Sequence, residues 1–288
     1  MDTSAFKVHG IEFLQVGGET YGRVTDGASH ALYPLCPAVF EKPARAVMTD
    51  LDGTTLSSEM FWVYVIECTM RELLGDKKFG LEEADLPFVC GYTTAEHLRY
   101  CIGKYAPGKS LAEANAIYHR AASRELDAVL RGEGNTGSFV PAPGLKEFLL
   151  ALKKSGVKIG LATSGLEYKA VPEIAAVFRT IGLGDPLAFY DAVITGGKRK
   201  DSGEYGTIGE IAAKPHPFLY SELACFGLHE PDPRRVIGIE DSAAGVLSLR
   251  FAGYAVLGVN GGTIAASGLD ALCLRKRDSL ADFLDDIL

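Results

Sequence analysis

The stretch Ala46-Val47-Met48-Thr49-Asp50-Leu51-Asp52-Gly53-Thr54-Thr55 joins an apolar run to a turn that contains two carboxylates. We expect residues 45–48 to form a buried strand, because the run is apolar and ends in residues typical of turns. Residues two apart in a strand point to the same side, so the side chains of Asp50 and Asp52 can face one site at the strand's end. This stretch therefore predicts a central strand with a candidate site beside it.

The two carboxylates can divide a reaction between them. One can attack phosphorus and form an acyl phosphate, while the second protonates the leaving oxygen and then activates water. Gly53 lets the backbone turn close to an anion. Two other interpretations of these residues are a turn that merely ends a strand and part of a calcium loop. The calcium loop is disfavoured because Leu56 and the apolar Phe61-Trp62-Val63 follow too soon for further oxygen ligands.

Further apolar runs alternate with helical patterns along the chain. The runs that we expect to be strands are residues 45–48, 157–162, 192–195, 236–239 and 254–259. The helical patterns include residues 144–155, 218–226 and 243–251. Continuous apolar strands separated by helices predict a parallel sheet that is covered on both faces. The predicted fold class is therefore α/β.

A long segment separates the first two predicted strands. It is about a hundred residues long, far more than one crossover helix needs. Its helical patterns are residues 59–74, 94–105 and 111–130. Glycines among β-favouring residues near the amino terminus predict a hairpin or irregular strands. The domains that we expect are an N-terminal extension at 1–42, a core at 43–56 and 141–288, and an all-helical cap at 57–140.

Polar residues follow or precede three more of the predicted elements. Thr163 and Ser164 follow the second strand, Lys214 precedes the helix that begins near residue 218, and Glu240 and Asp241 follow the fourth strand. A hydroxyl with exposed amides can hold phosphate oxygens, a lysine can neutralise them, and paired carboxylates can complete a magnesium site. Each motif by itself also has an ordinary explanation: a strand-end turn, a surface lysine and a helix cap.

The order of four motifs, DLDGTT, LATSG, KPHP and GIEDSAAG, resembles the haloacid dehalogenase superfamily over residues 44–288. The resemblance implies a Rossmann-like parallel sheet as the core. The helical insertion after the first motif matches the helical-cap subclass of that superfamily, and the chain is similar to its beta-phosphoglucomutase and sugar phosphatase group.

The resemblance also assigns roles to individual residues. It implies that Asp50 is the nucleophile and that Asp52 is the acid and base. The candidate phosphate-binding residues are Gly53, Thr163, Ser164 and Lys214. The implied cofactor is Mg²⁺, held by Asp50, the main-chain carbonyl of Asp52 and Asp241, with Glu240 adjacent to or within the coordination sphere.

The carboxylate at Asp52 narrows the expected reaction. Dehalogenases of this superfamily usually carry tyrosine at that position, whereas an acid there suits phosphate esters, whose alkoxide leaving group needs a proton. We therefore expect a phosphatase that acts on a small phosphorylated metabolite, a sugar or polyol phosphate. A sugar phosphomutase is the alternative, disfavoured because Thr94 stands where the mutase cap typically has arginine. A non-catalytic phospholigand-binding relative is a third possibility, and the complete set of motif residues argues against it.

Substrate contacts from the cap are expected near the segment Gly91 to His97. The candidates are Tyr92, Thr93 and His97, with Lys104 as a further one. His97 also fits a surface or packing role, and Tyr92 also fits simple packing.

The composition excludes some partners and favours a soluble enzyme. The 288 residues carry a formal charge of −8, so we expect no nucleic-acid or membrane partner, because both need a basic surface. The short basic run Lys198-Arg199-Lys200 and the run Arg275-Lys276-Arg277 are interpreted as solvated surface. Six scattered cysteines without ligand-like spacing and no visible signal peptide predict a cytoplasmic protein. The oligomeric state is not predicted.

Overall fold

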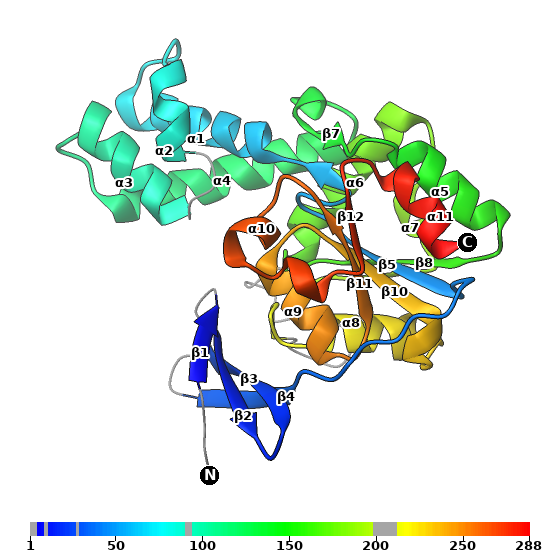
Figure 1. Cartoon of the computed structure of the whole chain (residues 1–288). Coiled ribbons are helices and arrows are strands. Elements are labelled where there is room, and N and C mark those ends of the chain that lie inside the picture. The colour runs from blue at the N-terminus through cyan, green and yellow to red at the C-terminus, as the bar shows by residue number, and fades with distance from the viewer. Residues whose placement is uncertain (1–4, 9–10, 27–28, 90–93, 198–211) are drawn as a thin grey trace. The chain divides into compact units, whose positions relative to one another are not determined.

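The chain consists of two compact units (Figure 1). The computed structural model describes residues 5–8, 11–26, 29–89, 94–197 and 212–288. Unit 1 comprises Met1–Leu56, Pro141–Ala170 and Phe178–Leu288, and unit 2 comprises Ser57–Val140 and Val171–Val177. Within the described ranges, no helix combines the length and the apolar character that crossing a lipid bilayer requires.

A six-stranded parallel sheet forms the centre of unit 1, in the order β12-β11-β10-β5-β8-β9. The strands are β5 (Ala46–Asp50), β8 (Lys158–Ala162), β9 (Ala192–Ile194), β10 (Val236–Glu240), β11 (Ala255–Val259) and β12 (Arg275–Arg277). β5 lies between β10 and β8, and all of its residues are buried. The predicted α/β class with a parallel sheet is confirmed.

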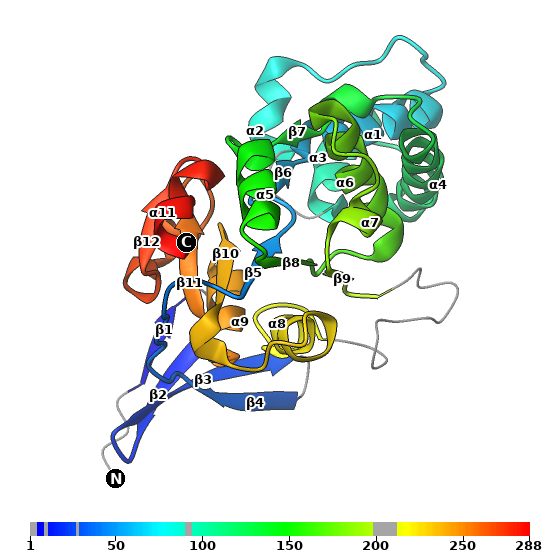
Figure 2. The ribbon, with the colours of Figure 1, turned by 90° about the vertical axis from the view of Figure 1, so that its right-hand side faces the viewer.

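Helices cover both faces of this sheet. α5 (Leu145–Lys154) and α11 (Leu284–Ile287) lie on one face, and α8 (Phe218–Glu222) and α9 (Ala243–Phe251) lie on the other, as Figures 1 and 2 show. Among the described residues of unit 1, the remaining α-helices are α7 (Pro186–Phe189) and α10 (Ile264–Ser267), and α6 (Glu167–Ile181) has its middle part in unit 2. A π-helical turn, Leu223–Gly227, continues α8 and completes the helix expected at 218–226.

Two elements differ from the sequence-based expectation. Arg275-Lys276-Arg277 is not merely a solvated cluster but the edge strand β12, paired with β11. The prediction missed it because an edge strand gains its main-chain hydrogen bonds without needing an apolar pattern. Helix α6 was also missed, and it carries Pro172 in its second turn, a residue that usually marks the end of a helix. The loop interpretation of Lys198-Arg199-Lys200 lies outside the described residues.

The N-terminal extension forms a four-stranded antiparallel sheet within unit 1. Its strands are β1 (Ala5–Val8), β2 (Ile11–Val16), β3 (Glu19–Asp26) and β4 (Ser29–Pro34), in sequence order. Ile11, Phe13 and Val24 are buried in the same hydrophobic cluster as Leu219 and Val246 of the core helices. Figures 1 and 2 both show this sheet beside α8 and α9. The extension therefore shares its hydrophobic core with the six-stranded sheet and its helices.

Unit 2 is helical among its described residues. Its helices are α1 (Glu59–Leu74), α2 (Leu86–Val89), α3 (Thr94–Tyr105) and α4 (Leu111–Leu130). The three longer ones coincide with the ranges predicted from apolar periodicity. α4 begins at Ser110, whose side chain accepts a hydrogen bond from the amide of Glu113. Two short strands, β6 (Leu56–Ser57) and β7 (Val140–Pro141), pair where the chain passes between the units.

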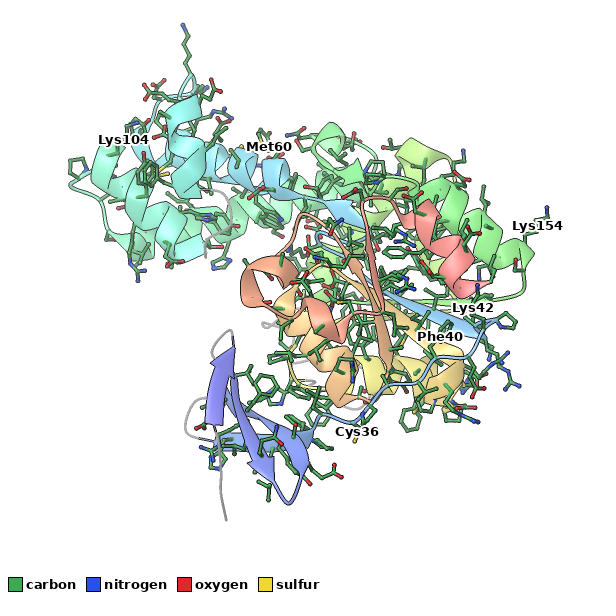
Figure 3. All side chains as sticks on the ribbon, in the orientation of Figure 1. Cys36, Phe40, Lys42, Met60, Lys104 and Lys154 are labelled. Atoms are coloured by element: carbon green, nitrogen blue, oxygen red, sulfur yellow. The ribbon has the colours of Figure 1, made fainter. Side chains whose placement is uncertain are left out.

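A buried carboxylate ties the segments of unit 2 together. Asp85 accepts hydrogen bonds from the hydroxyls of Tyr100 (2.6 Å) and Tyr105 (2.5 Å), from Lys104 Nζ (2.7 Å) and from the Glu82 amide (2.9 Å). Burial by itself raises the pKa of Asp85, but these donors outweigh it and hold the pKa well below its usual range. Lys104, labelled in Figure 3, is thus held by Asp85, which disfavours the substrate contact expected for it.

We predict that Asp85→Asn lowers the free energy of unfolding of unit 2 by about 1–3 kcal/mol at neutral pH, because an amide cannot accept from all of these donors. The depressed pKa means that the ionised carboxylate stabilises unit 2 above about pH 4 and loses this effect as the pH falls. Urea unfolding followed by the fluorescence of Trp62, the single tryptophan of the chain, measures this in unit 2.

The matched control is Glu82→Gln, which removes the exposed partner of the same lysine. An exposed ion pair contributes about 0–1 kcal/mol, so this variant should unfold almost as the parent does. Equal stability of the Asp85→Asn variant and the parent at pH 7 would contradict the argument, as would a difference that grows on acidification.

Candidate active site

The end of β5 supplies the first two site residues. Asp50 is the last residue of β5 and is buried, whereas the side chain of Asp52 is 38% exposed. Gly53 has a φ of 88°, and its amide donates to the Leu56 carbonyl at 2.7 Å, so the backbone closes a tight turn after the strand. A buried carboxylate and a half-exposed one thus sit on the same turn, which suits unequal chemical tasks.

Lys214 brings a buried cation to Asp50. Its side chain is only 6% exposed, and Nζ donates to Asp50 Oδ1 and to Glu240 Oε1, the latter at 2.6 Å. Nζ also donates to the carbonyl of Ala162 at 3.3 Å. Burial lowers the pKa of the ammonium, but the two carboxylates outweigh it and raise the pKa of Lys214, so the group stays cationic. The three chemical groups come from β5, β10 and the segment before α8.

Glu240 is held on both carboxylate oxygens. Besides Lys214, its Oε1 accepts from the Tyr220 hydroxyl at 2.6 Å, and its Oε2 accepts from the Ser242 hydroxyl at 3.1 Å. The Glu240 carboxylate occupies the space that a side chain at Gly245 would fill, since a Cβ there would lie 1.8 Å from Oε1. Glu240 therefore acts first as the buried counter-charge of Lys214.

Asp241 lies in a cradle made by two glycines. A Cβ at Gly53 would lie 2.2 Å from Asp241 Oδ2, and a Cβ at Gly262 would lie 2.4 Å from the same oxygen. The Thr54 hydroxyl donates to Asp241 Oδ1 at 3.2 Å. Burial and the neighbouring Glu240 raise the pKa of Asp241 to about 6. The chain thus brings this carboxylate close to other acids despite the electrostatic cost.

The three carboxylates form a set that suits a divalent cation. Ligand oxygens of Asp50, Glu240 and Asp241 lie within 4.8 Å of one another. Burial and the charge of Glu240 raise the pKa of Asp50 well above its usual range, although Lys214 counteracts them. Excess negative charge on hard oxygen donors is what Mg²⁺ offsets. The structure therefore brings Asp50, Glu240 and Asp241 together, while the binding of Mg²⁺ by them and by the Asp52 carbonyl stays a prediction.

Two hydroxyls lie at the neighbouring strand end. Thr163 and Ser164 follow β8, whose last residue is paired with Asp50. The Thr163 hydroxyl accepts from the Gly165 amide at 2.9 Å, and the Ser164 hydroxyl accepts from the Lys214 amide at 3.1 Å. Ser164 therefore holds the backbone of the lysine segment, and the assignment of both residues to phosphate binding stays a prediction.

Several residues of the site were not predicted from the sequence. Lys169, in the first turn of α6, donates to Asp52 Oδ2 at 3.3 Å. Tyr220 binds Glu240, and Gly262 leaves room for Asp241. Lys169 follows the second motif closely in sequence, and that proximity was the one available signal.

The structure describes only one of the three residues that were expected to contact a substrate from the cap. Tyr92 and Thr93 lie outside the described residues. His97 is buried on α3 of unit 2, and burial lowers its pKa, so the imidazole is neutral at pH 7. Its burial favours the packing role, and its contact with a substrate stays a prediction.

The fold and the site together define an α/β enzyme class whose reactive groups lie at the carboxyl ends of central parallel strands. The chain belongs to the haloacid dehalogenase-like hydrolase family, whose model matches residues 44–253. This confirms the resemblance drawn from the four motifs. No curated protein sequence matches the chain.

Solved structures share the fold of this chain. CbbY from Rhodobacter sphaeroides, in complex with phosphate, is 19% identical and has a TM-score of 0.55, with 84% of this chain and 96% of CbbY covered. A predicted phosphoglycolate phosphatase from Haemophilus somnus is 16% identical, with a TM-score of 0.58 and coverage of 84% and 97%. A subfamily IA hydrolase of the superfamily from Geobacter sulfurreducens is 18% identical, with a TM-score of 0.58 and coverage of 85% and 97%. A CbbY variant was solved with xylulose-(1,5)bisphosphate.

We predict that Gly262→Ala weakens Mg²⁺ binding at least about tenfold, because the added Cβ displaces both the main-chain carbonyl and the carboxylate of Asp241. Calorimetric titration with Mg²⁺ measures the dissociation constant. Gly108→Ala is the control, since a Cβ at Gly108 meets nothing within 4 Å. An unchanged dissociation constant for Gly262→Ala would show that Asp241 does not bind the cation.

Proposed function

We propose that this protein is a Mg²⁺-dependent phosphatase of a small phosphorylated metabolite, a sugar or polyol phosphate, which works through an aspartyl-phosphate on Asp50. The observation that carries the proposal is the buried Lys214 ammonium, held between Asp50 and Glu240 at the carboxyl edge of the sheet. The ammonium stays cationic and partly neutralises the charge of the buried carboxylate, so that an anion can approach it. With Asp52 two residues further on, the site has a nucleophile and a proton carrier.

The charges of the site favour a phosphoryl group. Asp50, Glu240 and Asp241 together carry more charge than the Lys214 ammonium can offset, so an incoming phosphate dianion would be repelled by the acids alone. Bound Mg²⁺ would offset this repulsion and polarise the phosphoryl oxygens. We assign the cation to Asp50, Asp241 and the Asp52 carbonyl, with Glu240 adjacent to it or within its coordination sphere.

The proposed reaction has two steps on the same residues. A carboxylate oxygen of Asp50 attacks phosphorus, the bond to the ester oxygen breaks, and Asp52 gives its proton to the leaving alkoxide. Asp52 then takes a proton from water, which attacks the aspartyl-phosphate and releases inorganic phosphate, so that Asp50 is regenerated. Lys214 stabilises the charge on the transferred group, and Thr163, Ser164 and the turn at Gly53 bind its oxygens.

The similar structures support a phosphorylated ligand. CbbY was solved with phosphate and, as a variant, with a sugar bisphosphate. A sugar phosphomutase would form the same phosphoenzyme but return the phosphoryl group to the sugar, so product analysis separates the two. Free phosphate without isomerised sugar phosphate supports the phosphatase, whereas isomerised product alone would replace it with the mutase.

Removal of Mg²⁺ with a chelator should abolish phosphate release, because without the cation the acids repel the substrate. Added Mg²⁺ should restore the release. Release of phosphate from a panel of sugar and polyol phosphates, with and without chelator, provides the measurement. Full turnover in excess chelator would remove the cation from the proposal.

Substitution of each acid of the first motif should impair a different step of the reaction. Asp50→Asn removes the attacking oxygen, so no phosphoenzyme forms. Asp52→Asn keeps the nucleophile, and we expect its turnover to fall about 10²–10⁴-fold, the usual range for general acid–base catalysis. With a good leaving group, which needs little protonation, Asp52→Asn should still accumulate a hydroxylamine-labile phosphoryl group on Asp50.

Mass spectrometry locates that phosphoryl group. Asp50→Asn serves as the matched control, because it replaces one carboxylate oxygen with an amide NH₂ group and keeps the rest of the side chain. Phosphate found on another residue, or on the Asp50→Asn variant, would overturn the assignment of the nucleophile.

A further inference from the structure

The segment that carries Lys214 is contacted by a part of the chain that lies outside the family match. The family model begins at residue 44, whereas the N-terminal sheet is formed by residues before it. The segment Lys214-Pro215-His216-Pro217 precedes α8, and the N-terminal sheet lies beside α8 and α9 in both views (Figures 1 and 2). The position of a catalytic lysine can therefore depend on an element that the family model does not include.

Tyr33 of β4 makes the direct connection. Its hydroxyl is 2.8 Å from His216 Nδ1, and the two rings meet edge to face at a centroid distance of 5.7 Å. The Tyr33 ring also stacks on Phe251 of α9 at 5.6 Å. Gly22 of β3 makes this approach possible, since a Cβ there would lie 2.2 Å from the Phe251 ring. The sheet thus holds Tyr33 against both the helix and the lysine segment.

Two hydrogen bonds to side-chain hydroxyls also fix the backbone of the segment. The Lys214 amide donates to the Ser164 hydroxyl at 3.1 Å, and the His216 carbonyl accepts from the Ser248 hydroxyl of α9 at 2.6 Å. These bonds hold the main chain together with the bond from the His216 amide to the Ala213 carbonyl at 3.1 Å, while Tyr33 holds the imidazole ring of His216. Loss of the hydrogen bond between the Tyr33 hydroxyl and the His216 imidazole would leave the segment freer to shift Nζ relative to Asp50.

We propose that the N-terminal sheet positions Lys214, and that Tyr33 is a positioning residue that acts through His216. The sheet then keeps Lys214 in place at the site, in addition to covering the hydrophobic core. The consequences for phosphate binding rest on the proposed function, whereas the consequences for the segment itself do not.

The first test measures hydrogen–deuterium exchange at the amides of Lys214 and His216 in the intact protein. Tyr33→Phe removes one hydroxyl and keeps the ring, and we expect exchange at both amides to rise about threefold to tenfold. His216→Leu should give at least the same rise, because it also removes the stacking on Phe218, and adding Tyr33→Phe to it should change nothing further. Tyr21→Phe is the control, since Tyr21 lies on the neighbouring strand β3 and no hydrogen bond among the described residues joins it to this segment.

Equal exchange in Tyr33→Phe and in Tyr21→Phe would overturn the proposal, and so would additive effects of Tyr33→Phe and His216→Leu. This measurement needs no substrate and no activity, so it decides the role of the sheet even if the protein is not a phosphatase.

The second test measures the dissociation constant of inorganic phosphate in the presence of Mg²⁺. We expect Tyr33→Phe to weaken phosphate binding about threefold to tenfold in the parent and to have no effect in a Lys214→Met background, because it acts through that lysine. An equal loss in both backgrounds would contradict a role through Lys214. A parent that neither binds phosphate nor releases it from any ester refutes the proposed function, and the exchange test then stands alone.

Discussion

The buried ammonium of Lys214 is the interaction on which the rest of the site depends. A lysine that is only 6% exposed needs carboxylate partners, because the free energy of burying a lone cation is prohibitive. Asp50 and Glu240 meet this need, and they lie at the ends of the adjacent strands β5 and β10. The parallel sheet places two strand ends and the segment before α8 at one edge. The fold thereby brings the two acids to the lysine, and the acids make its burial possible.

The same balance explains why the site suits a divalent cation. Two acids neutralise Lys214, and Asp241 adds a third carboxylate within 4.8 Å of the others. Glycines make this density possible, because the close approach at Gly53 and Gly262 leaves room for the Asp241 oxygens where any side chain would displace them. The raised pKa of Asp241 and of Asp50 is the electrostatic cost of that arrangement in the absence of a metal. A divalent cation bound to these carboxylates would offset the cost and would leave the site able to accept an anionic group.

The N-terminal sheet adds a support that the family model does not contain. Its inner face is buried against α8 and α9, and α9 begins two residues after Asp241. A sheet that packs on these helices therefore reaches the site indirectly, through helix positions and through Tyr33. In unit 2 the buried Asp85 has a comparable organising role, since three of its donors lie on α3 and the fourth is the amide of Glu82, so it joins two segments of the helical part.

Sequence alone determined the elements with strong periodicity and the motif residues at strand ends. The apolar runs predicted β5, β8, β9, β10 and β11, and the two-residue spacing of Asp50 and Asp52 indicated one shared site. Sequence could not show β12, whose charged residues pair through the main chain, or the partners of individual side chains. Lys169 reaches Asp52 across 117 residues and Lys214 reaches Asp50 across 164, and no spacing rule covers such separations. Local patterns determine backbone periodicity, whereas contacts between distant residues follow from the order of strands in the sheet, which only the tertiary structure decided.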